Sequence, residues 1–249
     1  MIHIEDGVQE LIDSTDDLVK SLFESQDKMK DFLLTLSQMY NTSYSNILLL
    51  KNKRKDISFV ANKETMEKYK FHIKDKEEPL KIIKRIKAAD EIKFKIDEVY
   101  DISQTDAVRK EQKTYSKEYI EVLLKGMCSR RGISFEDNNL MLNLENIITD
   151  ISSNSRSSNA SMYNVDQHAS QTQVEVNATI FAVAKKLNIN TRNYNLKDIC
   201  KWGINKDVRT LKESLKYIQK FTNYFIKDFQ TQEKLNHIEN EKEEDEEME

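Results

Sequence analysis

The sequence has few of the residues and none of the motifs that define most enzymes. Its 249 residues include four glycines, one proline and two cysteines, too few glycines for a glycine-rich phosphate-binding loop. It contains no HExxH segment, no GxSxG segment and no His/Cys cluster at metal-ligand spacing. Cys128 and Cys200 lie far apart and outside any CxxC pair, which favours two reduced thiols. The residues alone therefore indicate no catalytic residue, no cofactor and no metal site.

Long apolar segments are also missing. No run approaches the roughly 20 apolar residues that a membrane-spanning helix needs. The first residues are acidic and lack the basic-then-apolar order of a signal peptide. We therefore expect a cytoplasmic protein without a membrane partner. The scarcity of glycine and proline predicts few sharp turns and much helix.

Charge is unevenly distributed, although the net charge is only −4. Residues 1–31 hold nine acids against three lysines, and residues 51–95 hold fifteen Lys/Arg against eight Asp/Glu. Residues 239–249 hold eight acids and one lysine, so we expect a disordered acidic tail over 235–249, because like charges resist packing. This tail is either a solubilising segment or an imitation of DNA that competes for the basic middle segment.

Hydrophobic periodicity predicts an α+β fold. Apolar residues at helical spacing predict helices over 7–24, 27–39, 46–51, 63–70, 116–130, 140–152, 176–187 and 211–229. Alternating or β-prone runs predict strands over 57–61, 81–86, 92–96 and 99–102. This order predicts an acidic N-terminal helix within residues 1–24, then helices with a small antiparallel sheet to about residue 108, then a mostly helical second domain. The Ser/Asn-rich stretch 154–171 predicts a flexible insert, because it has little apolar surface to bury.

Cations and aromatic residues alternate in the basic middle segment. Tyr69 and Phe71, for example, lie among Lys68, Lys70 and Lys74. This pattern suits single-stranded nucleic acid, because cations neutralise phosphates and exposed rings stack on unpaired bases at about 1–3 kcal/mol each. A solvated, lysine-rich face without a ligand explains the pattern equally well.

Two segments resemble the N-terminal domain of ArdC-type antirestriction proteins. FLLTLSQMYNTSYSNILLL (32–50) has an apolar helix, a turn at Tyr44-Ser45-Asn46 and a second apolar helix, as that domain does. VYDISQT (99–105) is similar to the Val-Phe-Asp-Ile-Ser-Gln-Thr signature that ends the domain. Met66 or a neighbour occupies the position of a tryptophan in that family, and Lys76-Glu77-Glu78 occupies the position of a Lys-Gly-Glu turn but lacks its glycine. The resemblance implies a domain over 25–108 that binds single-stranded DNA.

The second half resembles the zinc-peptidase domain of the same family. The helix with a glutamate zinc ligand corresponds to residues 175–187. The segment that follows it in the family, which ends in a tryptophan, is similar to 187–202, and the long final helix is similar to 211–226. The resemblance implies a zincin-like domain over 115–230.

The zinc-binding positions of that family are substituted here. The resemblance puts Thr149 and Ser153 at the two histidine positions, Asp150 at the glutamate base and Asn177 at the glutamate ligand. Hydrolysis by zinc needs three protein ligands and an open position for water, and threonine, serine and asparagine are poor ligands. We therefore expect a pseudopeptidase that is not an enzyme.

The resemblance implies a protein of a plasmid, conjugative element or phage that protects or escorts single-stranded DNA against restriction. Composition and position predict as DNA contacts Tyr40, Tyr44, Asn46, Lys51, Lys53, Arg54 and Lys55. The alternative is an inhibitor or adaptor whose pseudopeptidase groove and DNA-mimicking tail bind a protein. That partner would be encoded by the host or the element, such as a defence or replication protein.

Overall fold

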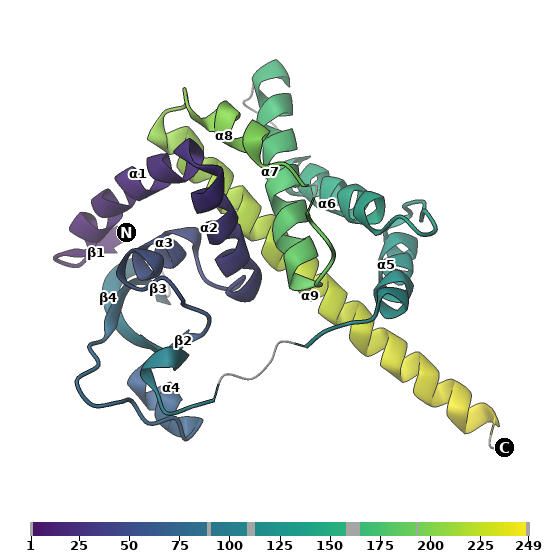
Figure 1. The fold of residues 1–249 in the computed structure, drawn as a ribbon, viewed down its shortest axis with the longest axis horizontal. Coiled ribbons are helices and arrows are strands. Elements are labelled where there is room, and N and C mark those ends of the chain that lie inside the picture. The colour runs from purple at the N-terminus through teal and green to yellow at the C-terminus, as the bar shows by residue number, and fades with distance from the viewer. Residues whose placement is uncertain (1, 89–90, 109–112, 158–164, 193, 248–249) are drawn as a thin grey trace. The chain divides into compact units, whose positions relative to one another are not determined.

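The structure, a computed structural model, describes residues 2–88, 91–108, 113–157, 165–192 and 194–247. Two compact units divide the chain, and each is described by itself. Unit 1 comprises Met1–Gln112 with Gly203–Glu213, and unit 2 comprises Lys113–Trp202 with Ser214–Glu249. The elements in chain order (Figure 1) are β1 (Ile2–Ile4), α1 (Val8–Glu24), α2 (Gln26–Gln38), α3 (Tyr44–Lys53), β2 (Val60–Ala61), α4 (Lys63–Lys68), β3 (Leu80–Ala88), β4 (Glu91–Asp101), the 3-10 turn η1 (Ile102–Gln104), α5 (Lys117–Arg131), α6 (Leu140–Ser157), α7 (Val165–Lys186), α8 (Lys197–Gly203) and α9 (Val208–Glu247). The predicted α+β class is confirmed.

The sheet of unit 1 is built around β4. Strand β3 pairs with it antiparallel along its whole length, and β2 pairs antiparallel at Asp101. Strand β1 pairs with it in parallel, with Ile2 opposite Ile92. Because β3 occupies one edge of β4, β1 and β2 share the other. The predicted antiparallel sheet is thus confirmed for β2, β3 and β4, whereas β1 adds a parallel pair that periodicity could not indicate in three residues.

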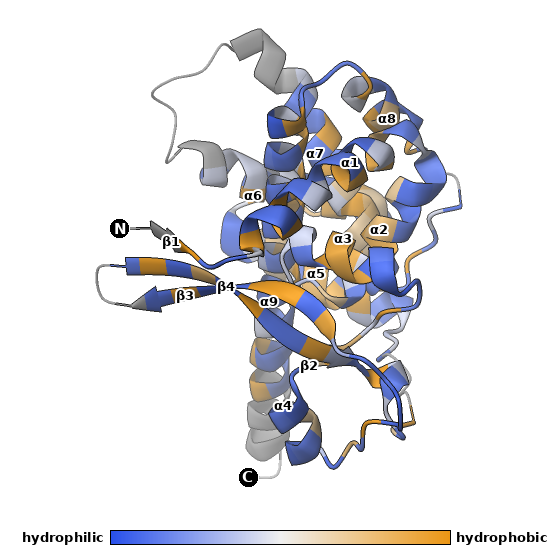
Figure 2. Ribbon diagram, turned by 90° about the vertical axis from the view of Figure 1, so that its left-hand side faces the viewer, coloured by the Kyte–Doolittle hydropathy of each residue, from blue (hydrophilic) through white to orange (hydrophobic). Residues whose placement is uncertain are grey.

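Polarity alternates along most of β4, whereas in β3 the pair Ile82-Ile83 is followed by Lys84-Arg85; Figure 2 shows hydrophilic and hydrophobic residues along both ribbons. Cross-strand partners share a face, so Ile82 lies beside Asp97, and Lys84 lies beside Lys95. The two β-prone runs expected at 92–96 and 99–102 join in one strand up to Asp101, because β3 pairs with β4 as far as Val99 and β2 pairs with the next two residues, and Ile102 begins η1. Helix α3 packs on β3, and helix α1 packs on α2 and α3.

The apolar stripes of the first three helices form the core of unit 1. Phe23, Phe32 and Ile47 are almost fully buried there. The segment Gly203–Glu213, which the sequence prediction had grouped with the second domain, clusters with this unit. Its Lys212 forms an ion pair with Asp16 of α1. Gly203 approaches so closely that a Cβ there would lie 2.3 Å from the Phe23 ring, and this contact fixes the segment against α1.

A buried carboxylate joins β4 to the chain that enters β2. Asp101 is fully buried. Its Oδ2 accepts the main-chain N–H groups of Ser58 and Phe59 at 2.9 and 3.3 Å, and its Oδ1 accepts that of Ser103 at 2.9 Å. Three donors compensate for the lost hydration of the carboxylate. The VYDISQT segment therefore ends the sheet with a hydrogen-bonded junction.

Gln104 extends this junction to the loop before β3. Its Oε1 accepts the main-chain N–H of Asp101 at 2.9 Å, which completes a capping box. Its Nε2 donates to the Glu77 carboxylate at 2.9 Å and to the Glu78 carbonyl at 2.8 Å. Glu77 in turn accepts both terminal nitrogens of Arg54. These hydrogen bonds connect the end of α3 with the loop that precedes β3 and with the end of β4.

Unit 2 is a helical assembly of α5, α6 and α7 with most of α9. Its core includes Phe221, Phe225 and Phe229, which recur every four residues along α9 and so share one face. Helix α5 meets α9 at Gly126, where a Cβ would lie 2.4 Å from the side chain of Gln232. A glycine inside a helix has a cost in stability, and here it makes room for that side chain.

Two expected disordered segments contain helix. In the predicted insert 154–171, α6 continues to Ser157 and α7 begins at Val165, and residues 158–164 lie outside the described residues. In the predicted tail 235–249, α9 continues to Glu247. Extending an existing helix costs far less than starting one, and Glu and Lys favour helix. Among the described residues, no helix has the length and apolar character needed to cross a membrane.

Candidate nucleic-acid interface

A hollow of about 680 Å³ with a mixed polar and apolar lining opens on unit 1. Its walls come from the α2–α3 loop, from β2 with the start of α4, and from β3 and β4. Both views of the ribbon show β2 next to α4 (Figures 1 and 2). Six small polar side chains line the walls, namely Asn41, Thr42, Ser43, Ser45, Asn62 and Thr65. Hydroxyl and amide groups can donate and accept hydrogen bonds, so the hollow suits a ligand with both kinds of partner.

Helix capping builds two of these walls. Ser43 begins α3, because its Oγ accepts the main-chain N–H of Asn46 at 3.3 Å. Asn62 begins α4 in the same way, accepting the N–H of Thr65 at 2.9 Å. Ser, Asn and related residues are strong N-caps, so the residues that begin these two helices also contribute polar side chains to the hollow.

Of the seven predicted DNA contacts, Tyr40 lies in the loop between α2 and α3, and Tyr44 is the first residue of α3. Tyr40 and Tyr44 are both half-buried. Burial raises the pKa of the Tyr44 hydroxyl above its usual value, and the nearby Asp16 carboxylate raises that pKa further. Both rings therefore present only part of their surface.

Asn46 has a structural role in addition to lining the hollow. Its side-chain Nδ2 donates to the main-chain carbonyl of Ile83 at 2.9 Å, and its Oδ1 accepts the Ile83 N–H at 2.9 Å. The side-chain amide thus pairs with the outer edge of β3 as a neighbouring strand would. This fixes α3 against β3 and leaves the amide largely engaged.

The four predicted basic contacts lie at the other end of α3, a helix about 15 Å long. Lys51 has only 12% of its side chain exposed and pairs with Asp31 at 2.8 Å. Arg54 holds Glu77 through two hydrogen bonds. Lys53 and Lys55 are exposed. The structure therefore separates the predicted set into two groups and engages two of its four cations within the fold.

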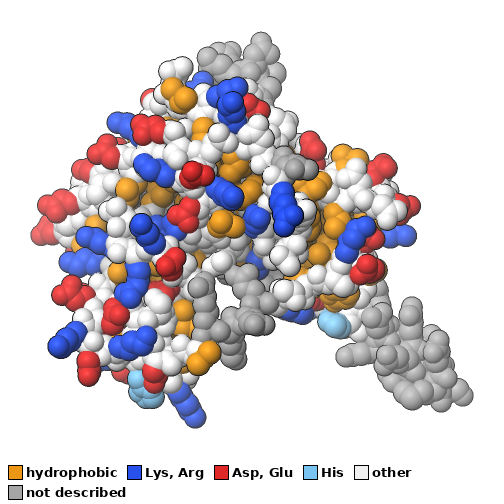
Figure 3. All heavy atoms as spheres, viewed as in Figure 1, with side chains coloured by type: hydrophobic (Ala, Val, Ile, Leu, Met, Phe, Trp, Pro, Cys, Tyr) orange, Lys and Arg blue, Asp and Glu red, His pale blue; other side chains and the backbone are white. Residues whose placement is uncertain are grey.

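Other cations lie closer to the hollow. Lys84 and Arg85 of β3 line it, and Lys84 pairs with Asp97 at 2.7 Å. Both are exposed. Sequence reasoning missed them because the register of β3 against β4, which decides their face, was unknown. Figure 3 shows basic and acidic side chains intermixed over the visible face of unit 1, so local arrangement matters more there than net charge.

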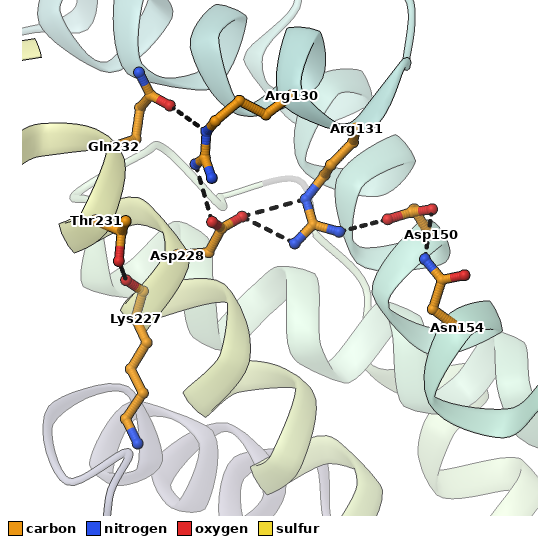
Figure 4. A network of polar contacts seen from close by, with 8 residues as sticks. All are labelled: Arg130, Arg131, Asp150, Asn154, Lys227, Asp228, Thr231 and Gln232. Carbon is orange, nitrogen blue, oxygen red and sulfur yellow. Dashed lines mark hydrogen bonds and ion pairs between the residues drawn. The ribbon is translucent and has the colours of Figure 1, made fainter. Parts of the chain in front are cut away.

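In unit 2, the predicted peptidase position Asp150 belongs to an ion-pair network (Figure 4). Asp150 accepts Nη1 of Arg131 and, at 2.9 Å, the Asn154 amide. Asp228 of α9 accepts Nη2 of Arg131 and Nη2 of Arg130, each at 2.9 Å. The network ties α5 to α6 and α9. Asp150 is therefore a structural carboxylate held by an arginine.

Asn177 lies at a separate hollow of about 720 Å³ in unit 2, together with Glu145 and Tyr194. The Tyr194 hydroxyl donates to the main-chain carbonyl of Asn177 at 2.9 Å, and burial, followed by the Glu145 charge, raises the pKa of that hydroxyl. The described lining does not include Thr149, Asp150 or Ser153.

Replacing Asn46 tests its structural role. Asn46→Ala leaves the N–H and carbonyl of Ile83 without their side-chain partner, so the free energy of unfolding should fall by about 1–3 kcal/mol. Urea denaturation followed by circular dichroism measures this. Asn52→Ala, on an exposed position of the same helix, is the control and should change the value by less than about 0.5 kcal/mol. Equal effects of the two substitutions would contradict the assignment.

Comparison with known proteins finds similarity in structure only. No protein-family model matches the sequence, and no curated protein matches it. Among solved structures, the Mn(II)-bound antirestriction protein ArdC from the R388 plasmid is similar, with a TM-score of 0.55 and 10% sequence identity. The match covers 90% of this chain and 98% of that one. The resemblance recognised in the sequence is thereby confirmed at the level of architecture: the chain has an ArdC-type fold.

Proposed function

We propose that this protein is a non-enzymatic, single-stranded-DNA-binding protein of a mobile genetic element. It would protect or escort DNA against restriction. The observation that carries the proposal is the hollow of unit 1, whose lining combines amide and hydroxyl groups and the cations Lys84 and Arg85 with apolar side chains and one acid, Asp97. Unpaired bases expose donors and acceptors that a duplex hides, and the strand's phosphates attract cations.

The exposed lysines at the end of α3 support the same proposal. Lys53 and Lys55 are exposed, whereas the neighbouring Lys51 and Arg54 are engaged by Asp31 and Glu77. Two uncommitted ammonium groups on a fixed helix end suit phosphate contacts that release counterions. The proposed strand contacts the hollow with its bases and this helix end with its backbone.

The antirestriction role is proposed from the fold. The ArdC protein of the R388 plasmid is described as an antirestriction protein, and this chain matches nearly its whole length. A protein that covers incoming single strands and has no need of catalysis would act in stoichiometric amounts.

The residues of unit 2 do not fit the metal of that structure. Transition metals in peptidase sites need several His, Asp, Glu or Cys ligands that converge. Among the described residues, no group of three or more such side chains could hold an ion. Asp150 is bound to Arg131, and Thr149 and Ser153 are exposed on α6. These observations support a non-enzymatic role.

A second candidate function is favoured by the hollow of unit 2. Four asparagines line it, at positions 139, 177, 190 and 195. Amide side chains complement the donors and acceptors of a polypeptide backbone. An inhibitor or adaptor that binds a host or element-encoded protein would use this hollow, and it would not require unit 1 to bind DNA.

Fluorescence anisotropy with a labelled single strand and its duplex tests the proposal. The single strand should bind more tightly, and its affinity should fall steeply with salt. Each phosphate contact contributes about 0.7 to the slope of log affinity against log salt, so Lys53→Gln with Lys55→Gln should reduce that slope by about 1.4. Arg85→Gln should also weaken binding, because it removes a cation from the hollow.

A matched pair of substitutions controls for total charge. Lys216→Gln with Lys234→Gln removes two exposed lysines from α9 and should leave the slope unchanged. Absence of strand binding at low salt would exclude the DNA-binding proposal and favour the adaptor. Equal slope changes in both pairs would mean that binding is unspecific.

Metal addition tests the non-enzymatic role. A ligand that binds only the native state raises the melting temperature, so Mn(II) or Zn(II) in moderate excess should leave the Tm unchanged. Differential scanning fluorimetry with and without a chelator measures this, and the metal content of the purified protein checks it independently. Stoichiometric metal, or a Tm rise that a chelator reverses, would contradict the pseudopeptidase assignment.

A further inference from the structure

Three aromatic rings meet on unit 1. The rings of Phe59 and Tyr69 have centroids 6.1 Å apart in an edge arrangement, and those of Tyr69 and Phe71 are stacked at 5.8 Å. We call these three residues the aromatic cluster. Phe59 directly precedes β2, and Tyr69 and Phe71 follow α4.

The aromatic cluster keeps much of its surface in water. Tyr69 is 57% exposed and Phe59 is 39% exposed, whereas Phe71 is half-buried. Folding would normally bury such rings, and exposed apolar surface that gathers at one place marks binding sites. A ring as exposed as Tyr69 has area available for a flat ligand.

The main chain holds the rings in fixed positions. The N–H of Phe59 donates to the buried carboxylate of Asp101 at 3.3 Å, and its carbonyl accepts the N–H of Ile102 at 2.9 Å. Tyr69 caps α4, and its N–H donates to the Thr65 carbonyl at 3.2 Å. Phe59 and Tyr69 therefore do not lose main-chain freedom when a ligand binds, which favours affinity.

The segment after Tyr69 is clamped as well. Lys70 has a positive φ of 60°, which turns the chain back so that the Phe71 N–H donates to the Met66 carbonyl at 3.0 Å. His72 then exchanges hydrogen bonds with Asp106: its N–H donates to the carboxylate at 2.8 Å, and its carbonyl accepts the Asp106 N–H at 3.0 Å. Phe71 is thus fixed from both sides.

The stretch of chain that contains the aromatic cluster has more basic than acidic residues. Residues 51–76 hold nine Lys/Arg against four Asp/Glu, and Lys70 and Lys74 next to the rings are exposed. An apolar peptide would bind the rings but would gain nothing from these cations. A polyanion with flat aromatic groups satisfies both, and single-stranded nucleic acid is such a ligand.

The aromatic cluster adjoins the hollow along the chain. Phe59 is followed by Val60, which lines the hollow, and Tyr69 lies one helical turn beyond Thr65, which also lines it. The elements that line the hollow therefore also carry two of the three rings.

We propose that the aromatic cluster is a base-stacking site, with Tyr69 and Phe59 as the rings that an unpaired base contacts. The inference rests on the proposed single-stranded-DNA binding and names the residues that let the protein prefer a single strand. A duplex keeps its bases stacked on one another, so it has no free base face to offer Tyr69.

Strands with and without bases separate stacking from charge. Wild type, Tyr69→Ala, Phe59→Ala and Tyr69→Phe are titrated as full-length proteins with a labelled single strand and with an abasic strand of equal length. Loss of one base–ring stack should weaken binding of the normal strand about five- to 100-fold. The abasic strand should bind the alanine variants and the wild type equally, and Tyr69→Phe should retain most of the affinity because it retains the ring.

Tyr224→Ala is the matched control, because Tyr224 of α9 is 55% exposed and should not affect either strand. Melting curves of all variants check that they remain folded. Wild-type binding that Tyr69→Ala and Phe59→Ala leave unchanged, or an equal loss for normal and abasic strands, would overturn the stacking site alone. Failure of the wild type to bind any single strand would remove the proposed function itself.

Discussion

The buried carboxylate of Asp101 is the interaction on which the arrangement of unit 1 depends. It accepts three main-chain N–H groups, and Gln104 links it to Glu77 and thereby to Arg54. A buried carboxylate is stable only when its hydrogen bonds are satisfied, so the end of β4, the entry to β2 and the end of α3 must keep this geometry. The same junction positions Phe59 and one wall of the hollow.

This junction also explains which cations are free. Arg54 belongs to it through Glu77, and Lys51 forms an ion pair with Asp31. Of the four cations at this end of α3, Lys53 and Lys55 remain exposed. In unit 2 the two arginines of α5 are likewise committed, because they hold Asp150 and Asp228. Composition shows how many charges a segment has, but the fold decides which of them a ligand can reach.

The sequence predicted the elements whose signals are local. Apolar spacing located α1 and α2 and the middle of α3. Strand β1 escaped notice, because three residues contain no period and its pairing with β4 spans the whole unit. The helical ends of the Ser/Asn-rich stretch were not predicted, because composition was the basis of that prediction. A helix can extend into polar residues from the helical residues next to them, whatever the composition of the stretch.

The candidate site was predictable only in part. Asn46 was identified, but its two bonds to Ile83 join residues 37 positions apart, so its structural role required the fold. The aromatic pair Tyr69 and Phe71 was recognisable in the sequence by its alternation with lysines. Phe59 was not, because its place beside Tyr69 depends on the hydrogen bond between its main-chain N–H and Asp101. Similarly, Thr149, Asp150, Ser153 and Asn177 were singled out by resemblance, but only the fold shows that Arg131 binds the Asp150 carboxylate.

Hydrogen–deuterium exchange of the full-length protein, with and without a saturating single strand, shows whether single-stranded DNA binds unit 1 at the hollow and the aromatic cluster. We expect slower exchange in residues 41–46, 59–65 and 69–74, because a bound strand covers these surfaces and suppresses local opening there. Protection confined to residues 139–145 and 190–195 of unit 2, or no protection anywhere, would contradict it.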